Sequence, residues 1–388
     1  MKRVVFLYTH PIQYFAPLHQ ELNKSNICKH IVLFCENTTE GYYDQEFGKR
    51  INWDIPLTSG YNFNFLKKSW ISILGSFFKY SNFSIAKYLH REETDILIVH
   101  GWNYFTAIYA IIIAKTSGVK VWLRAENPYI QEVEKTIFKK YLKKLFLQFG
   151  LFKLINKFLY IGQQNKLFYK NFGVKDDRLI FTPYCVDNDR LTKLNSELGP
   201  PHQMKNEIGV FQDRFMVLFS GKLIEKKNPM DLLKAFHIAS LKKGTLIFLG
   251  DGILLNSLKI YVNEHKLNNV IFAGFKNQSE LPKYYKAADV FVLPSGNGET
   301  WGLVVNEAMN FSLPIITSDR VGSASDLVVT NKNGFTYPLG DVKELARLLN
   351  RIELDAEWRK KAGEYSKELI KSYSYPVIIN NLKLTLSK

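Results

Sequence analysis

Short apolar runs recur along the chain and alternate with segments of helical pattern. An uninterrupted run predicts a strand buried on both faces, as in a parallel sheet covered by helices. Strands predicted from apolar runs, some with a polar or Pro residue at or near one end, occupy residues 4–8, 31–34, 96–99, 119–123, 159–162, 180–184, 215–219, 246–249, 270–272 and 289–293. Helices are expected at 104–114, 301–311 and 342–352. The alternation predicts an α/β protein built from doubly wound parallel sheets.

The length of 388 residues favours two domains, each with its own core. Residues 196–206 are rich in Gly, Pro and polar side chains, which is typical of a linker. We therefore predict an N-terminal domain at 1–195 and a C-terminal domain at 207–371.

The most informative stretch begins at the strand 289–293. A Ser/Gly/Asn loop follows this strand, Glu299 stands at the mouth of the next predicted helix, and Glu307 lies two turns further along. A strand–loop–helix junction points backbone N–H groups and the positive end of the helix dipole at whatever lies above the sheet. The pattern predicts a site for a pyrophosphate, with a carboxylate on either side to hold hydroxyl groups.

Glu299 and Glu307 enclose seven residues, among them Gly302-Leu303-Val304, and a Pro-Ile-Ile-Thr-Ser-Asp strand follows. This stretch resembles the paired-glutamate (E-x7-E) signature of retaining, nucleotide-sugar-dependent glycosyltransferases of family four, the glycosyl transferases group 1. The resemblance implies the GT-B fold, in which two Rossmann-like domains face each other across a cleft that holds the donor. It also implies that residues 372–388 return to the first domain. The likeness is dense from 215 to 328 and looser before that.

The resemblance implies roles for the residues of this stretch. Glu307 would accept hydrogen bonds from the ribose hydroxyls. Glu299 would contact the hydroxyls of the donor sugar, and capping of the helix is its alternative role. The remaining donor-binding candidates are Thr300, Trp301 and the backbone amides of Gly302 and Leu303.

A second loop follows the strand 215–219. Gly221, Lys222 and Lys227 resemble the family's phosphate loop, with Lys222 at the position of an arginine. Two lysines on a glycine-led loop neutralise a pyrophosphate as point charges, whereas an isolated lysine-rich loop is more often just solvated surface. Phe275 and Lys276 lie where the family has its base pocket, and ordinary loop roles are their alternative.

Three candidate positions on the acceptor or sugar side follow strands of the first domain. The loop 9–14 lacks the glycine pair that many family members carry, so Gln13 is a candidate through its side chain. His100 follows the strand 96–99, with helix capping or a place at the core edge as its alternative. Arg124 and Glu126 follow the strand 119–123, and their alternative role is an ion pair that ties loops together.

The formal net charge is +16, which favours anionic partners. In the segment 135–149, Lys135, Lys139, Lys140, Lys143 and Lys144 recur at helical spacing opposite apolar residues. Such a helix either rests on an anionic bilayer or packs its apolar side in the core with its lysines in water. A second basic-aromatic segment lies at 67–71. No recognition-helix or zinc-finger pattern supports binding to nucleic acid.

Three scattered cysteines predict neither a disulfide framework nor a zinc site, and they favour a reducing cytoplasm. The longest apolar run, 104–114, is shorter than the roughly 20 residues that span a bilayer. Asp187 and Asp189 form an Asp-x-Asp triplet, but they occupy a turn that the resembled family also has. We therefore expect no metal and no cofactor, with the nucleotide sugar bound as a substrate.

The resemblance thus implies a retaining hexosyltransferase that uses a UDP- or GDP-linked sugar, and we expect it to be metal-independent. Its acceptor is expected to be a glycan on a lipid carrier, in capsule, O-antigen or exopolysaccharide synthesis. We expect it in the cytoplasm or peripheral on the cytoplasmic membrane face. The alternatives are a catalytically inactive nucleotide-binding protein on the same fold, and a glycosyltransferase that modifies nucleic acid or protein.

Overall fold

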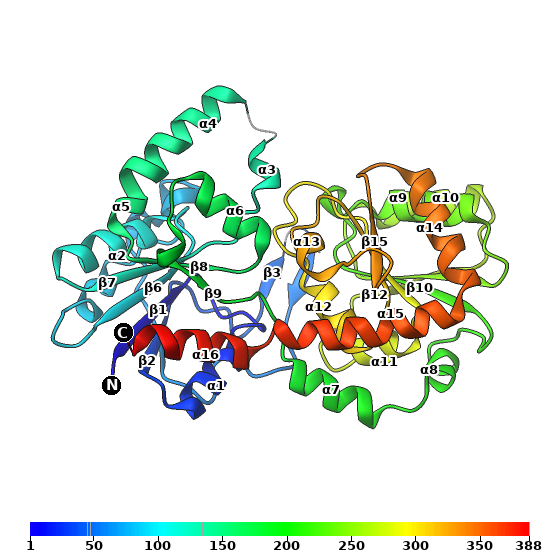
Figure 1. Ribbon diagram of the computed structural model, residues 1–388, viewed down its shortest axis with the longest axis horizontal. Helices are drawn as coiled ribbons and strands as arrows, with labels where there is room; N and C mark the ends of the chain where they lie inside the picture. The colour runs from blue at the N-terminus through cyan, green and yellow to red at the C-terminus, as the bar shows by residue number, and fades with distance from the viewer. Residues whose placement is uncertain (45, 47, 134–135, 388) are drawn as a thin grey trace. The chain divides into compact units, whose positions relative to one another are not determined.

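A computed structural model describes residues 1–44, 46, 48–133 and 136–387, and the chain divides into two α/β units (Figure 1). The first unit comprises Met1–Tyr42, Ile55–Tyr184 and Tyr375–Lys388, and the second comprises Tyr43–Asp54 and Cys185–Ser374. Each unit has its own sheet, in which every pair of neighbouring strands is parallel.

The first unit contains a seven-stranded sheet in the order β5-β2-β1-β6-β7-β8-β9. The strand β1 lies between β2 and β6, so that Leu7 is opposite both Leu33 and Val99. The strands are β1 (Arg3–Tyr8), β2 (Lys29–Phe34), β5 (Phe63–Phe65), β6 (Ile96–His100), β7 (Lys120–Arg124), β8 (Lys157–Tyr160) and β9 (Leu179–Phe181).

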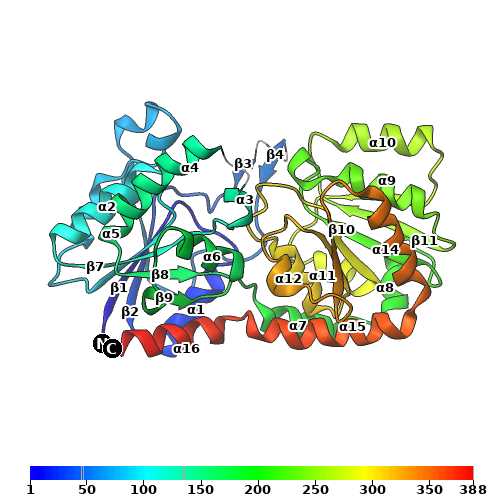
Figure 2. The ribbon, with the colours of Figure 1, turned by 45° about the horizontal axis from the view of Figure 1, so that its top comes forward.

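Helices cover both faces of this sheet. The core of one face contains alternate residues of the central strands, such as Leu7 and Val99, beneath α2 and the segment 147–152. The other side carries α1 and the C-terminal helix α16, which lies beside α1 and β9 (Figure 2). The hydroxyl of Tyr375 on α16 donates to the carbonyl of Tyr14 at 2.8 Å. The helices are α1 (Ala16–Ser25), η1 (Trp70–Ile73), η2 (Ser76–Phe78), η3 (Phe83–Tyr88), α2 (Phe105–Thr116), α3 (Ile130–Val133), α4 (Ile137–Lys144), the π-helical η4 (Leu145–Leu151), α5 (Phe152–Leu154), α6 (Gln163–Asn171), η5 (Asp176–Arg178) and α16 (Tyr375–Leu386).

The second unit contains a six-stranded sheet in the order β12-β11-β10-β13-β14-β15. Its central strands are buried along their whole length, as continuous apolar runs predict. The strands are β10 (Phe215–Ser220), β11 (Gly244–Leu249), β12 (Val270–Gly274), β13 (Val290–Leu293), β14 (Ile315–Ser318) and β15 (Gly334–Tyr337). A separate pair, β3 (Tyr42–Asp44) and β4 (Lys49–Ile51), precedes them in the chain.

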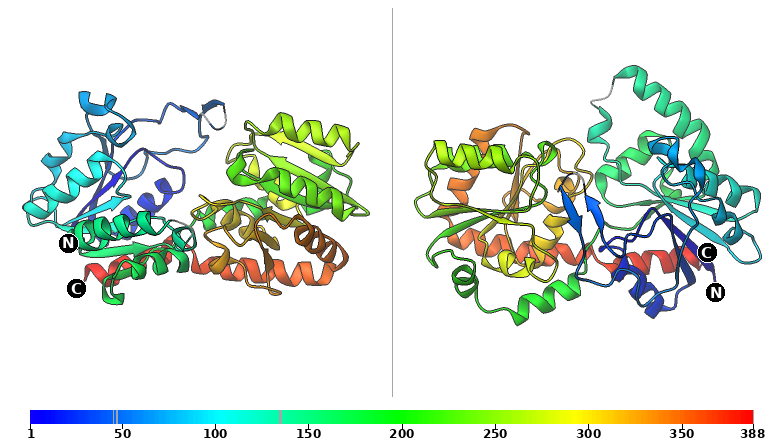
Figure 3. Two further views of the ribbon diagram at one scale, coloured as in Figure 1. Left: turned by 90° about the horizontal axis from the view of Figure 1, so that it is seen from above. Right: turned by 180° about the vertical axis from the view of Figure 1, so that it is seen from behind.

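Helices of the second unit again lie on both sides of the sheet (Figure 3). Helix α14 packs on α9, while α12 packs on α7 and α15. The helices are α7 (Asn188–Glu197), α8 (Pro201–Glu207), η6 (Glu225–Lys227), α9 (Pro229–Ala239), α10 (Leu255–Glu264), α11 (Leu281–Ala287), α12 (Leu303–Asn310), α13 (Ala324–Leu327), α14 (Val342–Leu354), α15 (Ala356–Leu369) and η7 (Ile370–Ser372).

The structure differs from the sequence-based prediction in several places, and residues 43–54 and 185–195 belong to the second unit although the sequence placed them in the first domain. The segment 196–206 contains the end of α7 and most of α8, rather than an irregular linker. Residues 333–335, whose Asn-Gly-Phe sequence is typical of a turn, contain the start of strand β15, where Gly334 pairs with Ile315. The short strand β5 was not predicted, since its Phe-Asn-Phe sequence forms no apolar run.

Candidate functional site

The predicted donor-binding residues gather at one edge of the second sheet. Strands β10 and β13 are neighbours, with Val217 opposite Val290. From β10 the chain continues to β11 and β12 on one side, and from β13 it continues to β14 and β15 on the other. Open α/β sheets bind ligands beyond the carboxyl ends of strands at such a reversal of strand order. The loops 221–228 and 294–302 lie at this place.

An ion pair joins these two loops. Lys227 ends η6, Glu299 lies in the loop after β13, and the Lys227 amine donates to Glu299 Oε2. The two side chains are only 14% and 9% exposed. Because a buried charge needs a partner, the pair fixes both loops in relation to each other. The ammonium group has three donors, so Lys227 can also serve a phosphate at this edge.

The start of α12 adds backbone donors beside this pair. Gly302 is the N-cap with φ +93°, and a Cβ there would lie 2.7 Å from Leu293 Cδ2. Glycine is therefore required by both backbone conformation and space. The N–H group of Leu303 belongs to the first turn and lies at the positive end of the helix dipole, whereas that of Val305 already donates to the Gly302 carbonyl at 2.9 Å.

Trp301 and Thr300 take part in this junction in different ways. The Trp301 side chain is buried, and its Nε1–H donates to Asn306 Oδ1 at 2.9 Å, which ties the loop to α12. Thr300 is half-buried, and its carbonyl lies against Gly322, where a Cβ would come within 1.9 Å of that oxygen. The Trp301 side chain therefore positions the start of the helix, while the half-buried Thr300 retains some exposure.

Glu307 lies inside α12 and is 2% exposed. Its Oε2 accepts a hydrogen bond of 2.8 Å from the hydroxyl of Tyr285 on α11. In the sequence Tyr285 looks like part of an ordinary apolar helix face, so no local pattern signals this role. Its hydroxyl holds the Glu307 carboxylate in one orientation.

Lys222 contacts an acidic segment far away in the sequence. Its amine lies 2.8 Å from Asp44 Oδ2 and 2.6 Å from Glu46 Oε2. Partial burial lowers the pKa of Lys222, but the bonds to the two carboxylates outweigh this and raise the pKa above its ordinary value. Gly221 precedes it, and its carbonyl leaves no room for a Cβ on Gly250. The phosphate-loop position is therefore an ion-paired lysine.

Phe275 and Lys276 lie in the loop after β12, and both are half-buried. The Phe275 ring is 6.2 Å from that of Trp53, and Lys276 pairs with Glu280 at 3.5 Å. Asp54 Oδ2 accepts from the Ser279 amide at 3.0 Å in the same loop. The segment 43–54 thus contacts both the Lys222 and the Phe275 loops, a role that sequence reasoning missed. Its acidic residues and Trp53 were the available signals.

In the first unit, His100 and Arg124 end neighbouring strands and face one aromatic cluster. The His100 ring lies 3.9 Å from that of Tyr8 and 5.1 Å from that of Phe15. Burial, and then the charge of Arg124, hold the pKa of His100 well below its ordinary value. The imidazole is therefore neutral at the edge of the core.

The Arg124 guanidinium lies over the rings of Phe15 and Tyr184, at 5.3 and 5.1 Å, and donates to the Thr182 carbonyl. Burial raises the pKa of Glu126, although Arg124 and the Tyr184 hydroxyl oppose this. Two aromatic rings and the Thr182 carbonyl hold the Arg124 guanidinium, whose charge also acts on Glu126. Gln13 is half-exposed on the loop after β1.

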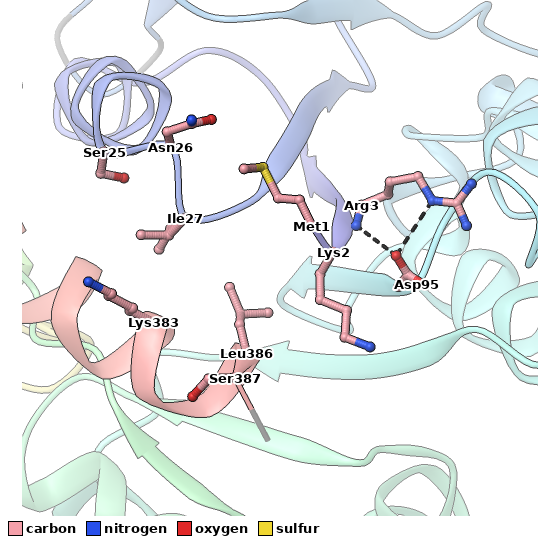
Figure 4. Close-up of a pocket in the computed structure, with 10 residues that line it drawn as sticks. All are labelled: Met1, Lys2, Arg3, Ser25, Asn26, Ile27, Asp95, Lys383, Leu386 and Ser387. Atoms are coloured by element: carbon pink, nitrogen blue, oxygen red, sulfur yellow. Dashed lines mark hydrogen bonds and ion pairs between the residues drawn. The ribbon is translucent and has the colours of Figure 1, made fainter.

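A polar pocket of about 740 Å³ lies at the amino ends of the strands of the first sheet, opposite the carboxyl ends where His100 and Arg124 lie (Figure 4). Lys2, Arg3 and Asp95 line it at the amino ends of β1 and β6, together with Lys383 of α16. The Arg3 amide donates to Asp95 at 2.7 Å. Since parallel sheets bind ligands at carboxyl ends, this pocket lies away from the candidate residues of its sheet.

Within the described part of the chain, no group of three or more His, Cys, Asp or Glu residues has the arrangement of a metal site. The Asp187 carboxylate accepts from the Arg190 amide at 3.0 Å and so caps α7. One member of the Asp-x-Asp triplet therefore has a structural role.

Comparison with known proteins bears on the second unit. Residues 202–369 match the family model of the glycosyl transferases group 1. This segment contains both loops of the candidate site and all of α12. The group 1 match therefore covers the residues on which the sequence-based resemblance rested.

Two curated proteins similar to this chain extend the comparison. The chain is 27% identical over 281 residues to the UDP-Gal:alpha-D-GlcNAc-diphosphoundecaprenol alpha-1,3-galactosyltransferase of Escherichia coli, covering 70% of each chain. It is 25% identical over 226 residues to the capsular polysaccharide biosynthesis glycosyltransferase CapM of Staphylococcus aureus, covering 58% of this chain and 56% of CapM. The chain is thus similar, over part of their length, to a galactosyltransferase and to a glycosyltransferase of capsular polysaccharide biosynthesis.

A solved structure matches over the whole chain. The crystal structure of HepE from Anabaena, in complex with UDP and glucose, superposes with a TM-score of 0.73 at 16% identity and covers 100% of both chains. At this identity the likeness concerns the fold alone. The predicted GT-B fold with two Rossmann-like domains is confirmed.

Proposed function

We propose that this protein is a retaining glycosyltransferase that moves a hexose from a nucleotide sugar to a glycan acceptor. The observation that carries the proposal is the largely buried Lys227–Glu299 pair beside the start of α12. It combines a cation, a carboxylate and backbone donors at the strand-order reversal of a group 1 segment. These are the groups that a sugar diphosphate requires.

The roles follow from the chemistry of each group. Lys227, Lys222 and the amides of Gly302 and Leu303 would stabilise the negative charge that develops on the leaving diphosphate. Glu307, oriented by Tyr285, would accept hydrogen bonds from the ribose. Glu299 would orient the sugar through its hydroxyls while it keeps its bond to Lys227.

In the proposed reaction the bond between the anomeric carbon and the phosphate oxygen breaks. The acceptor oxygen bonds to the same face of that carbon, and its proton passes to the leaving phosphate. Retention follows from departure and attack on one face, so no carboxylate nucleophile is required. Because lysines and helix-start amides supply the positive charge, we expect transfer to continue in EDTA.

The comparisons support UDP as the nucleotide, since the E. coli relative's name contains UDP-Gal and HepE was crystallised with UDP. That relative's name also describes a diphosphoundecaprenol acceptor. We accordingly propose a lipid-linked glycan as the acceptor, in cell-surface polysaccharide synthesis at the cytoplasmic membrane face. Phe275 and Lys276 are the proposed contacts to the base. Gln13, His100, Arg124 and Glu126 are proposed for the sugar or acceptor side.

Calorimetric titration with UDP and GDP tests the site. We expect UDP to bind more tightly than GDP, and Glu307→Gln to weaken UDP binding at least about tenfold through lost ribose hydrogen bonds. Glu357→Gln, on the exposed α15 surface, is the matched control and should bind UDP like the parent protein. If a folded protein binds neither nucleotide, the proposed site is wrong.

The second candidate, an inactive nucleotide-binding protein, is favoured by the loop around Gln13, which lacks the family's glycine pair. Incubation with UDP-hexoses and lipid-linked acceptors separates the two candidates. A glycosyltransferase releases UDP and lengthens the glycan, and NMR of the product shows the anomeric configuration of the donor. UDP binding without release of UDP from any donor would favour the inactive protein.

A further inference from the structure

An apolar surface lies along α4 and η4 of the first unit. We call it the α4–η4 stripe, and its members are between 42% and 85% exposed. They are Ile137, Phe138, Tyr141, Leu142, Leu145, Phe146 and Phe149. Their spacing of one and four residues places them along one side of the helical segment.

The opposite side of this segment faces the protein. Lys143 pairs with Glu132 at 2.6 Å, and its amine lies 4.8 Å from the centre of the Phe168 ring. Leu147 and Leu151 are buried on the same side. The interpretation of a helix with its apolar side in the core is therefore wrong, because no residue of α4 is buried. Lys135, which the sequence analysis included in this helix, lies outside the described residues.

The location of the segment also leaves the stripe accessible. Helix α4 projects from the body of the first unit in opposite views (Figures 1 and 3). No helix of the described residues is long and apolar enough to cross a membrane. A segment with an exposed apolar side and polar flanks is instead suited to lie in the plane of an interface.

The flanks of the stripe are positively charged. Lys139 and Lys144 are exposed, and neither has an ion-pair partner among the residues that the structure describes. Lys140 and Lys144 also line a pocket of about 320 Å³ together with Tyr129 and Tyr141. Lysines at the border of an apolar surface can place their stems against lipid and their amines at phosphate groups.

We propose that the α4–η4 stripe docks on an anionic phospholipid bilayer, with its apolar side chains in the interface and Lys139 and Lys144 against the headgroups. The charge of the flanks and the overall charge of +16 complement an anionic surface. A neutral apolar partner surface would leave these lysines without counter-charges. The docking does not rest on the proposed transfer reaction, although a bilayer is where a lipid-linked acceptor would be met.

Flotation with vesicles tests the proposal on the full-length protein without donor or acceptor. We expect binding to vesicles of phosphatidylcholine with phosphatidylglycerol, and much weaker binding to phosphatidylcholine alone. The double variant Phe138→Ser/Phe146→Ser should reduce binding to anionic vesicles at least about tenfold, because two apolar anchors are lost. Lys139→Gln/Lys144→Gln should reduce it by about fivefold for each lysine at low salt.

The matched control replaces two equally exposed apolar residues of the second unit, Phe211 and Leu354, which are 75% and 79% exposed. Phe211→Ser/Leu354→Ser should bind vesicles like the parent protein. Thermal melting of all variants shows whether they are folded. Equal vesicle binding by the stripe variant and the parent protein would overturn the proposal. So would a stable dimer in light scattering that only the stripe substitutions dissociate, because a second copy would then cover the stripe.

Discussion

Lys227 and Glu299 are 72 residues apart in the sequence, yet their largely buried side chains form a hydrogen-bonded ion pair between two loops of one sheet edge. The pair holds the two loops in place, because removing either side chain would leave an uncompensated charge where little water can solvate it. In the proposed reaction Lys227 serves the diphosphate and Glu299 serves the sugar.

We predict that Lys227→Met lowers kcat by about 10²- to 10³-fold, because a donor to the developing charge is lost. Steady-state transfer from UDP-hexose measures this effect. The neighbouring exposed Lys226 provides the control, and Lys226→Met should keep kcat within about twofold. If Lys226→Met were the more damaging substitution, the assignment of the phosphate-binding lysine would be wrong.

The start of α12 gives a second prediction. Gly302→Ala meets both a left-handed backbone and a contact of 2.7 Å with Leu293, so we expect a loss of more than about 2 kcal/mol in unfolding free energy and weaker UDP binding. Gly340 has a similar φ, +83°, but open space around its Cβ position. Gly340→Ala should therefore cost only about 1 kcal/mol and leave UDP binding unchanged. Denaturant titration and calorimetry measure the two effects, and equal losses in the two variants would contradict the steric argument.

The contrast between β13 and β15 shows how far the sequence predicts this fold. Buried central strands such as β13 are continuous apolar runs, so their pattern marks them directly. Strand β15 lies at the sheet edge and begins at Gly334, a residue that otherwise signals a turn. Its place depends on pairing with β14, which no local pattern contains.

The same contrast between local sequence patterns and long-range contacts applies to the candidate site. Glu299 and Glu307 were predicted because strand, loop and helix signals surround them in one stretch. The partners of Lys222 were missed because Asp44 lies 178 residues before it. The sequence also could not predict that the α4–η4 stripe faces outward. Periodicity separates two faces of a helix but does not show which face packs on the core.

The Lys222 contacts give a third prediction. Because Asp44 and Glu46 neutralise the amine that the proposed mechanism assigns to the diphosphate, Asp44→Asn/Glu46→Gln should tighten UDP binding by about fivefold. Calorimetry measures the change. The same double substitution in a Lys222→Met background should produce no gain, which separates release of Lys222 from a general change in surface charge. Weaker UDP binding in the double variant would mean that the acidic segment supports the site instead.

The last prediction concerns acid stability of the first unit. Burial lowers the pKa of His30 to about 4, and neither of its ring nitrogens has a hydrogen-bond partner among the described residues. Between pH 6.5 and about 4 the unfolded chain therefore binds more protons at this histidine than the native state does, so stability falls as the pH falls. A shift of this size corresponds to a loss of up to about 3 kcal/mol at pH 4.

His30→Phe removes the titrating group and keeps an aromatic ring next to Phe6, whose ring lies 5.8 Å from that of His30. We expect the variant to resemble the parent protein at pH 7 and to be more stable at pH 4.5. Hydrogen exchange of β1 and β2 peptides at both pH values reports on this unit directly.

His202→Phe on the exposed surface of α8 is the control. His19 and His100, whose pKa values burial also lowers, should leave part of the acid sensitivity in place. Identical pH dependence in His30→Phe and the parent protein would show that His30 is not the source of the loss.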